Sequence, residues 1–446
     1  MNPASAPSAP AASWSQRLLA ADAEERVALG WSFLFFFCLL FGYYILRSVR
    51  EAMISADGTR LIPTVFTSVF FCMLALMPLY GAVVSRFPRR RFLPIVYLIV
   101  VLALVGFSLA LSGNSPAAWI TLAFAIFLSV INLFTDSVFW SFMSDIFVTD
   151  QARRFYGMIA AGGTAGAILG PFTTRLIVGR LGVPNLLLLS ALFYAICLLC
   201  IFQLLPWARA QSLKRERHDG ERVIGGGMLA GARLVVSKPL LFALVLFMFF
   251  GVSIGTLLYN EQAAVIGAQH LSAEARTEFF ATVDLGVNLL ALAVQLSLTR
   301  FLLTRFGVAP LLLSSALLAV AGMGSMAVAF SGGLVTAVQV VTRGMSFAFI
   351  KPARESLFTL VDRESRYKAK NFIDTVVYRG GDMTTSWAFL ALSGLGLGLP
   401  ALAGVWAGVA IIWTLSVLWI IHLQRRLHAD PSVTGVRDDQ PPGLSA

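Results

Sequence analysis

Long apolar stretches separated by short polar turns run through most of the chain. A helix needs about 20 apolar residues to cross the hydrocarbon core of a bilayer. Inside lipid the backbone must satisfy its own hydrogen bonds, so each stretch predicts an α-helix. We predict twelve spans, at residues 29–50, 61–84, 92–112, 117–144, 155–179, 184–206, 239–262, 276–302, 307–330, 334–360, 368–396 and 400–424.

The predicted spans form two groups of six, separated by the longest polar stretch, ARAQSLKRERHDGERVIGGG. SRFPRRRF in the first group matches TRFLLTRF in the second, and DQARRFYG matches DRESRYKA, at nearly constant separation. This order indicates an internal duplication. We therefore predict an all-α membrane protein, with twelve transmembrane helices in two pseudo-symmetric six-helix halves. Its parts are a cytoplasmic N-terminal tail (1–27), an N-terminal half (28–206), a basic cytoplasmic linker (207–238), a C-terminal half (239–426) and a cytoplasmic C-terminal tail (427–446).

Composition agrees with a multi-pass membrane protein. The chain is 58% hydrophobic and 13% charged, with a mean hydropathy of +0.79, whereas soluble domains are about a quarter charged. The net charge of +11 does not indicate nucleic-acid binding, because the basic residues lie mainly in turns. The turns after spans 2, 4 and 10 are basic and those after spans 3, 9 and 11 carry no charge. The positive-inside rule then places both termini in the cytoplasm and the chain in the cytoplasmic (inner) membrane.

Several kinds of chemistry are not expected. The four cysteines lie in apolar stretches, and Cys197 and Cys200 are best interpreted as packed core residues one turn apart. No histidines are spaced as metal ligands, and no nucleophile or phosphate-binding motif of an enzyme occurs. We predict no metal, no cofactor and no enzymatic activity. The glycine-rich stretch GMIAAGGTAGAILGP, residues 157–171, predicts close helix packing.

The first span ends in the charged sequence GYYILRSVREA, which contains Arg47, Arg50 and Glu51. Ionisable residues in a membrane helix are costly unless they meet a partner or a polar cavity, so they indicate a functional site. The alternative is that these side chains extend to the outer lipid interface. Three charges at an outer end oppose the positive-inside rule, which favours the functional interpretation.

Other predicted spans contain further charged and polar residues. Spacings of eight and eleven residues place Arg343, Lys351 and Arg354 near one helical face. Six basic and six acidic residues in the spans are compatible with a mixture of substrate contacts and salt bridges that gate the carrier. The candidate substrate-binding residues are Arg47, Arg50, Glu51, Arg343, Tyr378, Arg379 and Asp382. The candidate residues for gating or proton coupling are Asp136, Asp145, Asn260, Asp284, Lys351, Arg354, Glu355 and Asp374.

The layout and the loop GAVVSRFPRRRF resemble the major facilitator superfamily. Three stretches, YYILRSVREAM, FWSFMSDIFVTDQARRFYG and KPARESLFTLVDRESRYKAKNFID, are similar in order to motifs of the ATP:ADP antiporter family, the nucleotide translocases. The chain departs from that family at Lys351, where an acidic residue is usual, and near Asp382, where a lysine is usual. The resemblance implies a secondary active transporter that works by alternating access, with exchange or uptake of nucleotides or other anionic, phosphorylated metabolites.

Two other functions stay open on the sequence alone. A proton-coupled exporter of amphipathic compounds or drugs would use Asp136, Asp284 or Asp382 to carry the proton. A membrane sensor or other non-transporting protein is an alternative of a different class. The expected partners are a small anionic substrate and the lipid bilayer, and the oligomeric state, monomer included, is left open.

Overall fold

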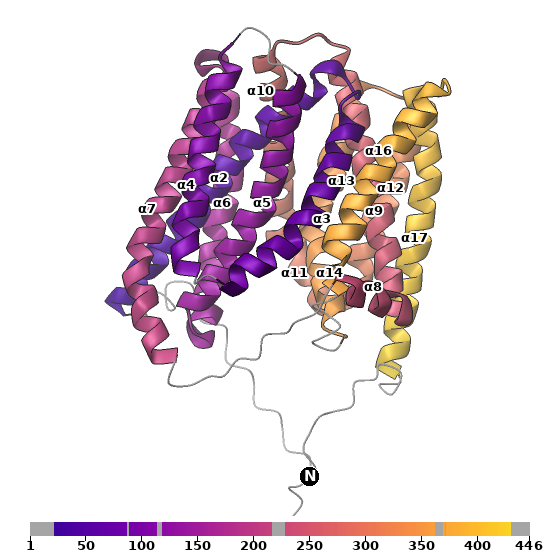
Figure 1. Ribbon diagram of the computed structural model, residues 1–446. Coiled ribbons are helices and arrows are strands. Elements are labelled where there is room, and N and C mark those ends of the chain that lie inside the picture. Colours follow the sequence, from indigo (N-terminus) through magenta and orange to yellow (C-terminus); the bar gives the residue numbers. More distant parts are fainter. Residues whose placement is uncertain are drawn as a thin grey trace, which may run out of the picture.

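The computed structural model describes residues 22–86, 89–113, 118–215, 228–361, 369–370 and 372–429, and almost all of these are helical. The long helices stand side by side in one bundle (Figure 1). The first helix begins and the last helix ends at the same end of the bundle, which we call the terminal end. We call the opposite end the far end.

The first half of the bundle is residues 23–215. Asp22 precedes the first helix, and Glu24 and Glu25 lie in its first turn, where acidic residues stabilise a helix. The predicted tail therefore gives way to helix at Ala23, before the first apolar residues. The helices are α2 (Ala23–Ile54), the short η1 (Ser55–Asp57), α3 (Ile62–Arg86), α4 (Arg89–Leu111), α5 (Ala118–Ile146), α6 (Thr149–Leu181) and α7 (Val183–Arg215).

The second half is residues 228–429. It contains three single turns of π-helix, which occur often at functional sites. The helices are α8 (Met228–Ser237), α9 (Pro239–Gly267), α10 (Ala273–Val294), the π-turn η2 (Gln295–Thr299), α11 (Arg300–Phe306), α12 (Ala309–Val328), α13 (Gly332–Met345), the π-turn η3 (Ser346–Ile350), α14 (Lys351–Phe358), the π-turn η4 (Ile373–Val377), α16 (Tyr378–Gly394) and α17 (Leu399–Ala429).

Ten helices of the described chain are long and apolar enough to cross a membrane. Two further helical segments, α3 and the continuous pair η4 and α16, occupy the positions of the second and eleventh predicted spans. The all-α membrane fold is confirmed, and the arrangement is consistent with twelve spans. Residues 1–21 and 430–446, and the middle of the predicted linker, lie outside the described residues.

The buried apolar side chains form two large clusters, one in each half. The first cluster contains residues between Ala28 and Ala208, and the second contains residues between Val235 and Ile421. Two small clusters join the halves instead. One packs Ala263 of α9 against α2, α3 and α5, and the other packs Ala52 of α2 against α9 and α10. Both small clusters lie near the far end, so apolar packing holds the halves together there.

Glycines on one face of α6 allow it to pack directly on the backbone of α2. A Cβ atom on Gly162, Gly166 or Gly170 would lie 2.6, 2.3 or 2.7 Å from the carbonyl oxygen of Phe33, Phe37 or Phe41, respectively. These distances are too short for any side chain. The close packing that the sequence predicts for residues 157–171 is thereby confirmed.

We expect the Gly166→Ala variant to be less stable by about 1–3 kcal/mol, the usual cost of overpacking, because its Cβ meets backbone and not a flexible side chain. The measurement is the thermal midpoint of the purified protein in detergent. Gly157→Ala is the matched control on the same helix, since a Cβ there meets nothing within 4 Å. That control should be neutral or slightly stabilising, because alanine is the better helix former. Equal midpoints for the two variants would contradict the packing argument.

Candidate functional site

The charged end of α2 points into protein. The side chains of Arg47 and Arg50 are 16% and 17% exposed, and that of Glu51 is 6% exposed. Arg47 Nε lies 3.7 Å from Glu51 Oε1, one helical turn away, and Arg50 pairs with the same carboxylate. Arg50 also donates a hydrogen bond to Ser129 Oγ on α5 at 3.2 Å. These side chains therefore end in protein contacts and not at a lipid surface.

Asp284 of α10 joins the two halves. Its Oδ2 lies 3.5 Å from Arg47 Nε in the first half, and its Oδ1 accepts a 3.1 Å hydrogen bond from Arg343 Nη2 on α13. The Asp284 side chain is only 3% exposed. A buried carboxylate shared by two arginines is strongly attracted to both, since little water screens it.

We call Arg47, Arg50, Glu51, Asp284 and Arg343 the charge cluster. It contains three arginines and two carboxylates, so it carries excess positive charge. The Nε–H groups of Arg47 and Arg50 donate no hydrogen bond to any described residue. The cluster thus has both net charge and hydrogen-bond donors left for an anion.

A tyrosine and an asparagine frame the charge cluster. Tyr44, one turn before Arg47, donates a 3.3 Å hydrogen bond to Asn288 Oδ1, and its ring centre lies 5.8 Å from the Arg47 guanidinium. Asn288 in turn donates to the carbonyl oxygen of Ala167 on α6 at 2.8 Å. Neither Tyr44 nor Ser129 is a candidate from the sequence alone, because tyrosine and serine are common in membrane helices and only the fold shows what they face.

A second ion pair lies on α16. Arg379 Nη1 is 3.3 Å from Asp382 Oδ2, and Thr256 of α9 donates a 2.7 Å hydrogen bond to Asp382 Oδ1. Tyr378 is 39% exposed, and its ring centre lies 5.4 Å from the Arg379 guanidinium. Asn260, which is fully buried on α9, donates to Ser386 Oγ on α16 at 3.3 Å. Asn260 therefore links α9 to α16 by a hydrogen bond inside the second half.

We expect that exchanging the two charges, Arg379→Asp with Asp382→Arg, retains part of the transport activity. Either single change leaves one charge without its partner, whereas the exchange restores a pair. The exchanged protein should be on the order of tenfold more active than either single variant, as for coupled neighbours. Uptake into vesicles containing equal amounts of folded protein is the measurement. An inactive double variant with an unchanged melting temperature would show that one of the two residues does more than pair.

The charges nearest the terminal end pair within the second half. Arg354 Nη1 lies 2.8 Å from Asp374 Oδ1, and its Nη2 lies 3.6 Å from Glu355. Lys370 Nζ lies 2.7 Å from Glu355. None of these contacts reaches the first half, so they fasten α14 to η4 in this conformation.

A π-turn lies between Arg343 and Lys351, whereas Arg354 follows Lys351 on the same regular helix, α14. η3 stands between Arg343 and Lys351, so the helix is not a regular α-helix there and the spacing of eight does not fix a common face. Arg343 turns to Asp284, whereas Lys351 is exposed and lies 4.5 Å from the ring centre of Phe347. The common face of the three residues stays a prediction, because the charges of Arg354 and Arg47 still act on Lys351.

Asp136 and Asp145 lie on α5 toward the terminal end and are half-buried. The charge of Lys351, in the other half, acts on Asp136, although the described residues show no ion pair between them. Asp145 is one residue from the end of α5. The structure therefore does not bring Asp145 into the charge cluster.

The halves contact each other between the middle of the bundle and the far end. Besides the contacts of Asp284 and Asn288, Arg276 Nε donates to the carbonyl oxygen of Ala52 at 3.1 Å and Trp387 Nε1 donates to Thr67 Oγ1 at 2.9 Å. This conformation is therefore closed at the far end.

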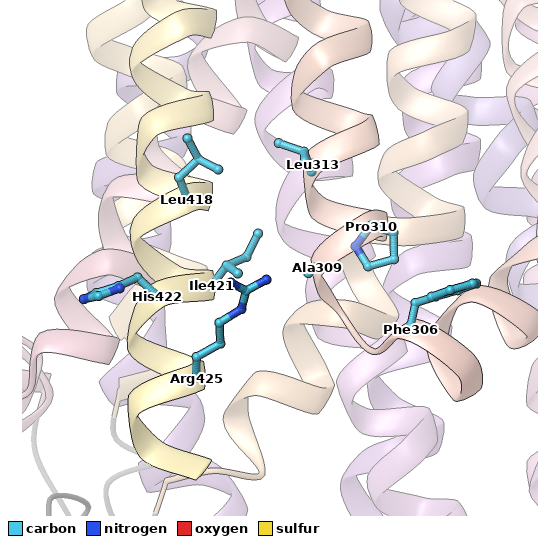
Figure 2. A pocket seen from close by; sticks show the side chains of 8 residues that line it. All are labelled: Phe306, Ala309, Pro310, Leu313, Leu418, Ile421, His422 and Arg425. Carbon is cyan, nitrogen blue, oxygen red and sulfur yellow. The ribbon is translucent and has the colours of Figure 1, made fainter. Parts of the chain in front are cut away.

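A separate groove lies at the terminal end between α11, α12 and α17. Figure 2 shows Leu313, Leu418 and Ile421 on its walls, with Arg425 at one side. It has a volume of about 450 Å³ and is lined mainly by apolar side chains. It lies outside the interface between the halves, so we do not assign it to the substrate. Among the described residues, no group of three or more His, Cys, Asp or Glu side chains could hold a metal ion.

Comparison with solved structures finds transporters with the same fold. The nucleoside transporter NupG matches with a TM-score of 0.63 at 14% identity, over 90% of this chain and 99% of that one. The POT family transporter PepTSo matches with a TM-score of 0.61 at 14% identity, over 90% and 98%. A bacterial homolog of the human lysosomal transporter Spinster, in an inward-facing and unoccupied conformation, matches with a TM-score of 0.51 at 14% identity, over 93% and 98%. At these identities the likeness shows the fold alone.

Comparison with families gives the wider assignment. No curated protein sequence matches the chain. The family model of the Major Facilitator Superfamily matches residues 28–368, which is more than half of the sequence. This match agrees with the helical bundle, with its apolar spans and with the polar groups held between its halves. The chain therefore belongs to the major facilitator superfamily and is a membrane transporter, not an enzyme.

Proposed function

We propose that this transporter carries nucleotides or other anionic, phosphorylated metabolites by exchange or uptake. The observation that carries the proposal is the charge cluster, in which three arginines share two carboxylates between the halves. Arginine suits phosphate because its planar guanidinium donates two parallel hydrogen bonds. The motifs similar to those of the ATP:ADP antiporter family support the same class of substrate.

Alternating access follows from the position of Asp284. In the far-end-closed conformation, this carboxylate holds Arg47 of the first half and Arg343 of the second. A phosphate that enters from the terminal end competes with Asp284 for the same guanidinium groups. Substrate binding thereby weakens a bond between the halves and favours their rearrangement toward the far-end-open conformation.

We also propose that the terminal end faces the cytoplasm and that the membrane is the cytoplasmic (inner) one. The helices α3, α5 and α14, which come before the basic turns of spans 2, 4 and 10, all end at this end, and the positive-inside rule assigns such turns to the cytoplasm. The conformation described above is then inward-facing. The residues Lys351, Arg354 and Asp136 would line the entrance, and Arg47, Arg50, Arg343 and Arg379 would lie deeper.

Thermal-shift measurements on the purified protein test the class of substrate. We expect ATP, ADP or another phosphorylated metabolite to raise the melting temperature, whereas organic acids without phosphate have a smaller effect. A ligand at 100 times its dissociation constant stabilises by about 2.7 kcal/mol, which is readily measured.

Two variants make this test specific. Arg47→Ala should lose the response to the anion, whereas Arg300→Ala, which removes an exposed arginine from α11, should keep it. Stabilisation by amphipathic cations but not by nucleotides would contradict the proposal and favour the proton-coupled exporter. Equal responses of the two variants would show that the anion binds elsewhere.

A further inference from the structure

One carboxyl group inside the second half has no partner. Glu261 on α9 is fully buried, and neither of its carboxylate oxygens is hydrogen-bonded to any described residue. Asp284 and Asp382, by contrast, are both held by arginines. Glu261 therefore differs from Glu51, Asp284 and Asp382, each of which pairs with an arginine.

Glu261 points away from the first half. Tyr259 and Ala263, which are each two residues away, pack against the first half, and two residues turn a helix by about 200°. Glu261 shares its face instead with Leu257 and Ile254, four and seven residues earlier, and both belong to the apolar cluster of the second half.

No charge on the neighbouring helices compensates Glu261. On α16, Arg379 and Asp382 pair with each other beside Thr256, and on α13, Arg343 pairs with Asp284. The ionisable residues of α17 begin at His422, near the terminal end.

The shorter elements in contact with α9 do not supply a charge either. Asp57 of η1 is exposed and acts on Arg276, and Asp374 of η4 pairs with Arg354. α8 packs near the beginning of α9, at the terminal end, whereas Glu261 lies six residues before the last residue of α9. No described ionisable group interacts with Glu261.

A cavity of mixed polar and apolar lining lies beside the same part of α9, toward the far end. It has a volume of about 450 Å³ and is lined by residues of α9, α10 and α13 that include Gln262, Gln269 and Thr336. Gln262, beside Glu261 in sequence, has an unpartnered amide nitrogen. Gln339, one turn after Thr336 on α13, has an unpartnered amide oxygen, and both glutamines are 2% exposed. Two buried glutamines with unpartnered amide atoms are therefore next to residues that line the cavity or line it themselves, and one of them, Gln262, adjoins Glu261 in sequence.

An ionised carboxylate without water, a counter-charge or a hydrogen-bond donor is very costly, so a buried carboxyl in such a place is neutral. We propose that Glu261 is a proton-binding site, loaded from the far end through this cavity, and that its proton favours the far-end-closed conformation. α9 connects the two events, because Tyr259, Ala263 and Gly267 make contacts between the halves on its opposite face. Ionisation of Glu261 demands water or a cation, which this packing does not provide, and so favours rearrangement of α9.

Infrared spectroscopy of the full-length protein tests whether Glu261 carries a proton. The difference spectrum between wild type and Glu261→Gln at neutral pH should contain the carbonyl band of one protonated carboxylic acid. Glu278→Gln, an exposed change on α10, should give no such band. Absence of the band from the Glu261→Gln difference would overturn the proposal. Glu261→Met, a neutral side chain of similar volume, repeats the measurement should the glutamine variant fold poorly.

The link to conformation needs a second measurement. Spin labels at positions 60 and 268, at the far end of opposite halves, report the separation of the halves in protein whose native cysteines have been replaced. In wild type, raising the pH should shift the population toward long distances. In Glu261→Gln, which cannot ionise, the distance between the labels should stay short at every pH. An equal pH response of both proteins would overturn the coupling. Neither measurement uses a substrate, so the result is independent of the proposed nucleotide specificity.

Discussion

Replacing Asp284 with asparagine should reduce transport about 30-fold or more. Asparagine keeps the shape of the side chain but leaves Arg47 and Arg343 without their shared carboxylate. Removing one partner of a buried charge pair typically costs about 2–5 kcal/mol, and every 1.4 kcal/mol is a factor of ten. The melting temperature should fall as well, because two guanidinium groups remain buried without a counter-charge. Radiolabelled substrate uptake into vesicles, normalised to folded protein, gives the measurement.

A double variant separates charge from structure. Asp284→Asn combined with Arg343→Gln removes one charge of each sign, so the stability lost in the single variant should partly return. Transport should not return, because the proposed anion site has then lost one of its three arginines. Glu278→Gln removes an exposed acid from the same helix and should behave as wild type. Wild-type uptake by Asp284→Asn would refute a role for this bridge in the transport cycle.

The fold could be predicted from the sequence because the bilayer permits few solutions. An apolar stretch long enough to span lipid must be a helix, and the basic turns and the polar linker divide the helices into two groups. The charged residues at positions 47, 50 and 51 could be selected for the same reason, since an ionisable side chain in a membrane helix needs a partner. Their position in the charge cluster follows from packing between distant helices, and sequence spacing does not contain that information.

Local backbone geometry limits what the spacing of charged residues can predict. A regular helix would place Arg343, Lys351 and Arg354 near one face, but the π-turn at 346–350 changes the register between the first and second of them. The sequence SFAFI has no glycine or proline that would indicate such a turn. The sequence does not show the partners of Arg354 and Glu355 for another reason. They meet Asp374 and Lys370 of the following segment, so a pair that looks suited to join the halves instead holds one half together.

The second large effect is expected at Gly267, the last residue of α9. A Cβ atom there would lie 2.6 Å from the Cα atom of Gly58 and 3.1 Å from the carbonyl oxygen of Ser55, both in the first half. These are backbone atoms, so no change of side-chain rotamer can relieve the contact. Gly267→Ala should therefore disfavour the far-end-closed conformation. Overpacking typically costs about 1–3 kcal/mol, which corresponds to a 5- to 150-fold shift in population.

A cysteine at position 55 can report this shift. Ser55 is fully buried in the far-end-closed conformation, and Ser55→Cys hardly changes its size. With Cys72 replaced, the other native cysteines are buried, so a membrane-impermeant maleimide should label the Gly267→Ala protein much faster than wild type. Gly255→Ala is the matched control on α9, since a Cβ there meets nothing within 4 Å, and its labelling should equal that of wild type. Slow labelling of all three proteins would show that the contact between Gly267 and Gly58 does not control the far end. Fast labelling with slow transport in Gly267→Ala alone would show that closing this end is an obligatory step of the cycle.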